Sequence, residues 1–130
     1  MELKILHFEK FWLVVSIFIM IAIFIQSSFS SVVTSSTFYQ YQFDKIVHMS
    51  VWLSLAFSLR LGLNKYFVNQ IKGNQRFLLL LLIVFCIVYG ISDEIHQIFV
   101  PSRSSDIFDV IADSIGSIFG AFIAHFLLSD

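Results

Sequence analysis

The acidic residues of this chain are concentrated in one stretch of an otherwise apolar sequence. The stretch is GISDEIHQIFVPSRSSDIFDVIADSIG, residues 90–116. It holds five of the nine acidic residues: Asp93, Glu94, Asp106, Asp109 and Asp113. Grouped carboxylates can bind a divalent cation, and together with a histidine they can transfer protons. The stretch is therefore the first candidate for a functional site.

Side chains suited to work with these acids lie in the same stretch and in the short run DKIVH at 44–48. Lys45 and Arg103 can bind a phosphate, and His48 or His96 can shuttle protons. The side chains that we expect to contact a substrate or ligand are Lys45, His48, Gln97, Arg103 and Asp109.

The local charge balance of this set is strongly negative. With Asp44 added, six carboxylates stand against two cations, a balance of −4 before the histidines are counted. Carboxylates beside a low-dielectric membrane cannot all stay ionised without compensation. Protonation of some acids, charged histidines or a bound cation would each supply that compensation.

A divalent metal ion is the candidate cofactor. Its expected ligands are Asp93, Glu94, Asp109 and Asp113. The spacing matches no established metal motif, because DEIHQ lacks the second histidine of HExxH. An acidic pocket without a metal would repel an anionic head group, so metal content separates the alternative functions.

The composition is that of an integral membrane protein. Of the 130 residues, 58% are hydrophobic and 13% charged, which is too little charge to cover a soluble domain of this size. The net charge of −1 gives no basic footprint for nucleic acid. The single cysteine, Cys86, lies in an apolar run and is expected to be a small buried residue.

Four segments are long and apolar enough to cross a bilayer as helices. They lie at about 11–29, 46–63, 77–99 and 107–128. A Ser/Thr-rich stretch follows the first, and no repeat or second domain interrupts the chain. The sequence therefore predicts an all-α, four-helix transmembrane bundle forming a single domain over residues 1–130.

The distribution of lysine and arginine predicts the orientation of this bundle. Four spans place six basic residues on the side of the termini: Lys4, Lys10, Arg60, Lys65, Lys72 and Arg76. Only Lys45 and Arg103 fall on the other side. We therefore expect both termini in the cytoplasm and the acidic residues at the outer face.

Helical periodicity predicts which faces turn inward. In the fourth span one narrow stripe carries the acids and the small residues: Asp106, Asp109, Asp113, Gly116, Ser117, Gly120 and Ala124. Phenylalanine and isoleucine fill the opposite side, which we expect to meet lipid. Small residues let helices approach closely, so the Gly116–Gly120 pair is expected to pack within this chain.

The depth of the acids argues for a role beyond structure. Asp93 and Asp113 each lie six residues inside the outer end of a span, roughly 9 Å below the rim, and could face each other. Ionisable residues at such depth are costly and usually functional. Asp106 and Asp44 have a simpler alternative as helix caps, and His125, near the other end, is read as incidental.

These motifs together resemble the VanZ-like family of small bacterial membrane proteins. The resemblance rests on DKIVHMSVWLSLAFSL and on YGISDEIHQIFVPSRSSDIFDVIADSIGSIFGAF, and it covers about residues 44–122. Two positions depart from the family pattern. Asp113 stands where the family often has Asn, and Ser102 stands where it often has Gly.

The resemblance implies a multi-pass protein of the bacterial cytoplasmic membrane with a role in the cell envelope. The founding member of the family is associated with low-level resistance to the glycopeptide teicoplanin. The favoured function is therefore binding or handling of a lipid, a lipid-linked envelope precursor or a lipophilic glycopeptide at the outer face.

Two alternatives stay open at this point. In a metal-dependent enzyme acting on a lipid phosphate, the catalytic candidates would be Asp93, Glu94, His48 and His96. In a proton- or cation-coupled transporter, Asp93 and Asp113 would be the carrier sites. Four spans are few for a transporter, so that alternative implies a homo-oligomer.

Overall fold

The computed structural model of the chain describes residues 2–29, 38–70 and 74–128, and all regular secondary structure in this part is helical. It contains four helices: α1 Glu2–Ser28, α2 Phe38–Gln70, α3 Gln75–Ile98 and α4 Ile107–Leu127. Each includes a segment long and apolar enough to cross a membrane: Phe8–Ser28, Gln42–Lys65, Gln75–Ile98 and Ile107–Leu127. The all-α fold class with four spans is confirmed.

The largest differences from the expected boundaries are in α1, which begins at Glu2 rather than at about residue 11, and in α2, which covers Phe38–Gln70 rather than about 46–63. Helix α2 begins at Phe38, so residues 38–43 form its first turns rather than a separate segment before it. Asp44 therefore lies inside α2, and its alternative role as a cap of the second span is wrong. The Ser/Thr-rich stretch falls mostly outside the described residues.

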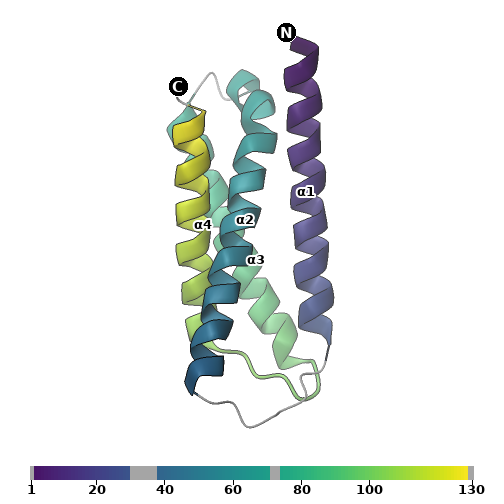
Figure 1. Cartoon of the computed structure of the whole chain (residues 1–130), viewed down its shortest axis with the longest axis vertical. Helices are drawn as coiled ribbons and strands as arrows, with labels where there is room; N and C mark the ends of the chain where they lie inside the picture. The colour runs from purple at the N-terminus through teal and green to yellow at the C-terminus, as the bar shows by residue number, and fades with distance from the viewer. Residues whose placement is uncertain (1, 30–37, 71–73, 129–130) are drawn as a thin grey trace.

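The helices run side by side along one axis, with both termini at the same end (Figure 1). We call this end the termini end, and the opposite end, where α3 connects to α4, the loop end. Helix α2 packs against all three others, and its contact with α4 is the most extensive in the bundle.

Two glycines explain the tight contact between α2 and α4. A Cβ atom added at Gly116 would lie 2.1 Å from the carbonyl oxygen of Met49, and one added at Gly120 would lie 2.1 Å from that of Leu53. No side chain fits at such distances, so the backbones touch directly. The expected packing of this pair within the chain is confirmed.

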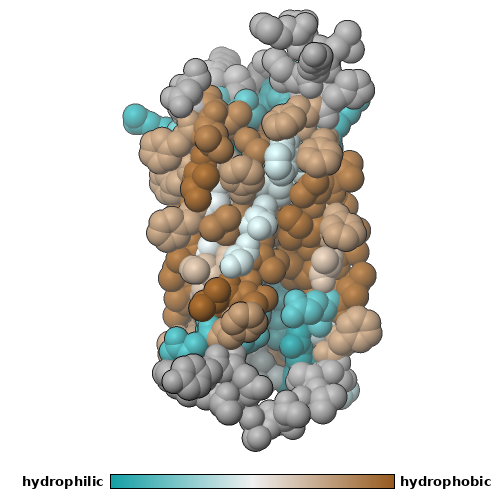
Figure 2. Space-filling view, viewed as in Figure 1, coloured by the Kyte–Doolittle hydropathy of each residue, from teal (hydrophilic) through white to brown (hydrophobic). Residues whose placement is uncertain are grey.

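The core between the helices is small and well packed. Trp52, Leu55 and Ala56 of α2 meet Cys86 of α3 and Ala121 of α4, all at most 2% exposed. Exposed phenylalanines, isoleucines and leucines cover the outside, and hydrophilic residues gather toward the two ends (Figure 2). An apolar belt with polar ends is what a bilayer requires of a spanning bundle.

The predicted faces of α4 are also confirmed. Its buried residues are Asp109, Ala112, Asp113, Gly116, Ser117, Gly120, Ala121 and Ala124. Asp106 caps the helix, because its side chain accepts a hydrogen bond from the backbone N–H of Phe108 at 2.9 Å. The helix thus begins at the loop end with its acids directed into the bundle.

Candidate functional site

Three helices bring the acids together at the loop end. Helix α2 supplies Asp44, Lys45 and His48, α3 supplies Asp93, Glu94 and Gln97, and α4 and its preceding loop supply the rest. We call this set the loop-end cluster, and its members are Asp44, Lys45, His48, Asp93, Glu94, Gln97, Arg103, Asp106, Asp109 and Asp113.

Lys45 is the central cation of the loop-end cluster. Its ammonium donates hydrogen bonds to Asp106, at 2.7 Å, and to Asp109, and it lies 3.8 Å from Asp44. The Lys45 side chain is 18% exposed and that of Asp109 is 8% exposed. This ion-pair network ties the second span to the beginning of the fourth.

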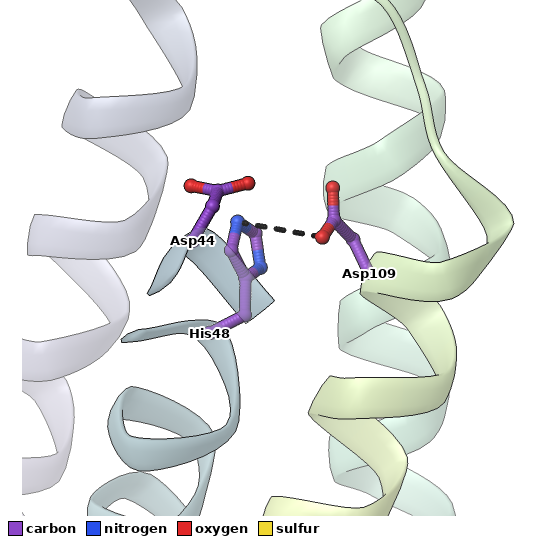
Figure 3. A group of neighbouring side chains, drawn as sticks. All are labelled: Asp44, His48 and Asp109. Atoms are coloured by element: carbon purple, nitrogen blue, oxygen red, sulfur yellow. Dashed lines mark ion pairs between the residues drawn. The ribbon is translucent and has the colours of Figure 1, made fainter. Parts of the chain in front are cut away.

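His48, one turn deeper in α2, engages the next two acids of α4. Its Nδ1 lies 3.1 Å from an oxygen of Asp113, and its Nε2 lies 4.0 Å from Asp109. Figure 3 shows the imidazole of His48 between Asp44, on its own helix, and Asp109, across the interface.

The acids of α3 are bonded locally rather than to the cations. Gln97, one turn further along, donates to Asp93 at 2.9 Å. The backbone N–H of Asp106 donates to Glu94 at 2.9 Å, which fixes the loop against α3. Asp93 and Asp113 belong to the same cluster, but each is hydrogen-bonded to a different residue.

Two carboxylate oxygens in the loop-end cluster accept no hydrogen bond from the protein. They are Oε1 of Glu94 and Oδ2 of Asp113, in side chains that are 5% and 2% exposed. Buried acceptors usually have a partner. A proton, a cation or a donor group of a ligand would satisfy these atoms.

The donor set best arranged for a metal ion differs from the expected one. Asp44, His48 and Asp109 each offer a ligand atom, and these atoms lie within 4.8 Å of one another (Figure 3). Two carboxylates and an imidazole suit a divalent transition metal. The ammonium of Lys45 is already bonded to Asp109 there, so a metal would have to compete with it.

Of the expected metal ligands, only Asp109 belongs to that group. Asp93, Glu94 and Asp113 are held by Gln97, the loop backbone and His48 respectively. Their role as metal ligands stays a prediction.

Two further expected site residues face α1. His96 lies 3.1 Å from the hydroxyl of Ser28, and its ring lies against that of Phe24 at 5.0 Å. Arg103 donates to the backbone carbonyl of Gln26 at 3.1 Å, and thereby fastens the α3–α4 loop to the end of α1. The His96 side chain therefore packs against α1.

A small polar pocket lies beside the cluster, under the loop. Its volume is about 20 Å³, enough for one water molecule or a small ion. Its polar lining consists of Gln26, Ser27, His48, Asp93, Gln97 and Arg103. Sequence reasoning missed Gln26 and Ser27, although two polar residues in the last turn of an apolar span were the available signal.

An apolar groove lies next to this pocket, nearer the middle of the bundle. It has a volume of about 430 Å³ and runs between α1 and α2. Its lining residues are Phe18, Ile19, Ala22, Ser50, Val51 and Ser54. Val51 lines both spaces, so the groove and the polar pocket adjoin.

A protein-family model described as VanZ/LLP1 matches residues 8–128 and so includes all four spans. The chain belongs to the VanZ/LLP1 family. No curated protein and no solved structure matches it. As a VanZ/LLP1 protein with four spanning helices, it is a multi-pass membrane protein.

The VanZ-like motifs can now be placed in space. The DKIVH run forms the α2 side of the loop-end cluster, and the stretch at 90–116 forms its α3 and α4 sides. Ser102, the departure from glycine, has a φ of 64°. This left-handed conformation favours glycine, which explains why the family pattern has that residue here.

Proposed function

We propose that this VanZ/LLP1 protein is a non-catalytic binding module of the bacterial cell envelope that holds a membrane ligand at its loop end. The apolar chain of the ligand lies in the groove between α1 and α2, and its head group lies over the polar pocket. The observation that carries this proposal is the shared wall of groove and pocket at Val51. Together the two spaces suit a molecule that is part lipid and part polar.

The charge of the site selects the head group. The loop-end cluster has six carboxylates, while its cations are Lys45, Arg103 and, when protonated, His48. This excess of negative charge favours a ligand that brings positive charge and N–H donors. An ammonium head group, as in an aminophospholipid, has both properties.

The wider ligand class is suggested by the family. A lipid-linked envelope precursor or a lipophilic glycopeptide antibiotic also combines an apolar chain with a polar head. We place the site at the outer face of the cytoplasmic membrane, because lysine and arginine favour the termini end as the cytoplasmic one.

Quenching of tryptophan fluorescence by brominated lipids tests the proposal directly. The chain has two tryptophans, and a Trp12→Phe background leaves Trp52, which lines the polar pocket, as the reporter. We expect chain-brominated phosphatidylethanolamine to quench Trp52 more strongly than brominated phosphatidylglycerol at equal mole fraction.

Matched variants distinguish the effect of a charge in the pocket from that of a charge elsewhere in the cluster. They also distinguish a bulky side chain in the groove from one elsewhere on α1. Asp93→Asn, in the pocket wall, should weaken the phosphatidylethanolamine preference about tenfold, because a charged hydrogen-bond partner is lost. Asp44→Asn removes one charge from the same cluster but lies outside the pocket lining, so it should weaken the preference less than Asp93→Asn. Ala22→Phe should block the groove, whereas Val14→Phe, an exposed position on the same helix, should not.

Equal quenching of Trp52 by the two brominated lipids, in the Trp12→Phe parent and in every variant, would contradict the proposal. The same assay with a polyprenyl phosphate, with and without Mg²⁺, probes the precursor class. Binding of that lipid without a divalent cation would contradict the preference for positive charge.

A second candidate function rests on the Asp44–His48–Asp109 group. If a divalent ion displaces Lys45 there, it could hold a lipid phosphate and activate water for hydrolysis. Metal analysis of purified protein after incubation with Zn²⁺ or Mn²⁺ tests this. The enzyme candidate requires about one ion per chain, lost in His48→Gln but retained in His96→Gln, which lies against α1.

A further inference from the structure

A second polar group is buried at the opposite, termini end of the bundle. Its centre is Arg60 of α2, which is 1% exposed. The guanidinium donates to Oδ1 of Asn64 at 2.8 Å and to Oε1 of Gln75 at 2.6 Å, and it lies 3.3 Å from Nδ1 of His125. Helices α2, α3 and α4 meet at this residue.

The charge of Arg60 is not neutralised by these contacts. Its hydrogen-bond partners are two amides and an imidazole, and none of the acids in the described ranges forms an ion pair with it. Its Nε is buried and has no hydrogen-bond partner. A buried cation without a counter-charge is costly, so an anion at this place would be strongly favoured.

The orientation of the two amides provides donors for such an anion. A guanidinium can only donate, so the atoms of Asn64 and Gln75 that face it must be their oxygens. Their NH₂ groups therefore point away from Arg60, and both side chains are only half-buried. Gln75 is the first residue of its span and Asn64 the last but one, so both amides lie at the ends of the apolar segments.

An apolar groove begins beside this group. It lies between α2 and α3, has a volume of about 320 Å³ and is lined by Leu59, Leu63, Leu78, Leu81, Leu82 and Phe85. Leu59 and Leu63 flank Arg60 along α2, and Leu78 is one turn from Gln75. Leu81 and Phe85 are more than 40% exposed, so the groove opens toward lipid.

We propose that this groove binds an anionic phospholipid of the leaflet on the termini side, with its phosphate at the amides of Asn64 and Gln75 and one acyl chain along the leucines. Arg60 supplies the positive charge beneath the phosphate, and the exposed Arg76 adds charge at the rim. The site is separate from the loop-end cluster and independent of the function proposed for it.

Native mass spectrometry of the full chain in detergent, with phosphatidylglycerol and phosphatidylcholine as probes, tests the site. We expect phosphatidylglycerol to bind about fivefold more tightly, the effect typical of one basic residue near the membrane surface. Arg60→Gln should abolish the preference. Lys10→Gln removes an exposed cation on α1, at the same end but outside the groove, and should retain it.

Gln75→Glu keeps the test informative if Arg60→Gln fails to fold. Its carboxylate can accept the same hydrogen bond and supplies the counter-charge within the protein. This variant should fold at least as stably as the parent chain, measured by thermal unfolding, and should lose the phosphatidylglycerol preference.

Two results would overturn the inference. One is a phosphatidylglycerol preference that persists in Gln75→Glu. The other is displacement of phosphatidylglycerol by inorganic phosphate at millimolar concentration, because that would make the site a free-anion site. Leu81→Trp, which fills the groove, should weaken the binding of both phospholipids.

Discussion

At the scale of single residues, the excess negative charge of the loop-end cluster is partly compensated from α2. Lys45 bridges the acids at the start of α4, and His48 contacts the one below. Sequence reasoning identified every acid of the cluster and correctly turned Asp93, Asp109 and Asp113 inward, because composition and helical periodicity carry that information. Asp44, by contrast, has a side chain that is 56% exposed. Sequence reasoning could not assign the hydrogen-bond and ion-pair partners of these acids. The periodicity of one helix does not show which residue of another helix lies opposite.

Lys45→Gln is expected to lower the free energy of unfolding by about 2–4 kcal/mol, because it leaves buried carboxylates without their cation. Unfolding in mixed SDS micelles measures this change. The double variant with Asp109→Asn should recover part of the loss. Lys10→Gln, an exposed lysine at the other end, serves as the control, and an equal loss in both single variants would contradict a specific role for Lys45.

Arg60 and His125 show the limit of residue-level interpretation most clearly. The sequence placed Arg60 among the basic residues that orient the bundle, and it treated His125 as incidental. In the structure Arg60 is buried and contacts His125 across the α2–α4 interface. The sequence did not show which way this part of α2 is turned about its own axis. An arginine near the end of a span can therefore point either to the membrane surface or into the bundle.

At the scale of the elements, α4 was the most predictable helix and α2 the least. The stripe of aspartate, glycine and alanine gave the buried face of α4, and the structure confirms it. The short loop between the third and fourth spans pointed to α3 as the neighbour of α4. The more extensive contact of α4 is with α2, because Gly116 and Gly120 let the α2 backbone approach most closely.

Gly116→Ala and Gly120→Ala should each lower the free energy of unfolding by about 1–3 kcal/mol, the usual range for overpacking. The added methyl group would meet a backbone carbonyl at 2.1 Å, and the helices would have to separate. The same SDS titration measures the effect.

Gly90→Ala is the matched control within α3. Its Cβ would meet Asp113 and Trp52 at 3.5 Å, an ordinary contact. This variant should be neutral, or stabilising by up to about 1 kcal/mol through helix propensity. Equal destabilisation by all three substitutions would mean that glycine flexibility, rather than close α2–α4 packing, is what matters.

At the scale of the whole molecule, both termini lie at one end and the loop-end cluster, with six of the nine acidic residues, lies at the other. The architecture therefore has two chemically different ends. The loop end is acidic, whereas most of the basic residues, Arg60, Lys65 and Arg76 among them, lie toward the termini end. This asymmetry underlies both binding proposals.

Green fluorescent protein fused to the C-terminus should fluoresce, and alkaline phosphatase fused there should be inactive. The reason is that the basic residues at the termini end should keep that end in the cytoplasm. Paired fusions of alkaline phosphatase and green fluorescent protein in a bacterial host distinguish the two orientations. Phosphatase activity without fluorescence would place the loop-end cluster in the cytoplasm and remove the basis for an outer-face site.

The pairing of α2 with α4 also has a consequence for biogenesis. The ribosome completes α2 well before α4, yet Lys45 and Arg60 find partners among the acids and the histidine of α4. Polar groups of this kind oppose release of a nascent helix into lipid on its own. We therefore expect synthesis of the last span to make integration of the second one more stable, although the second is by itself long and apolar enough to span.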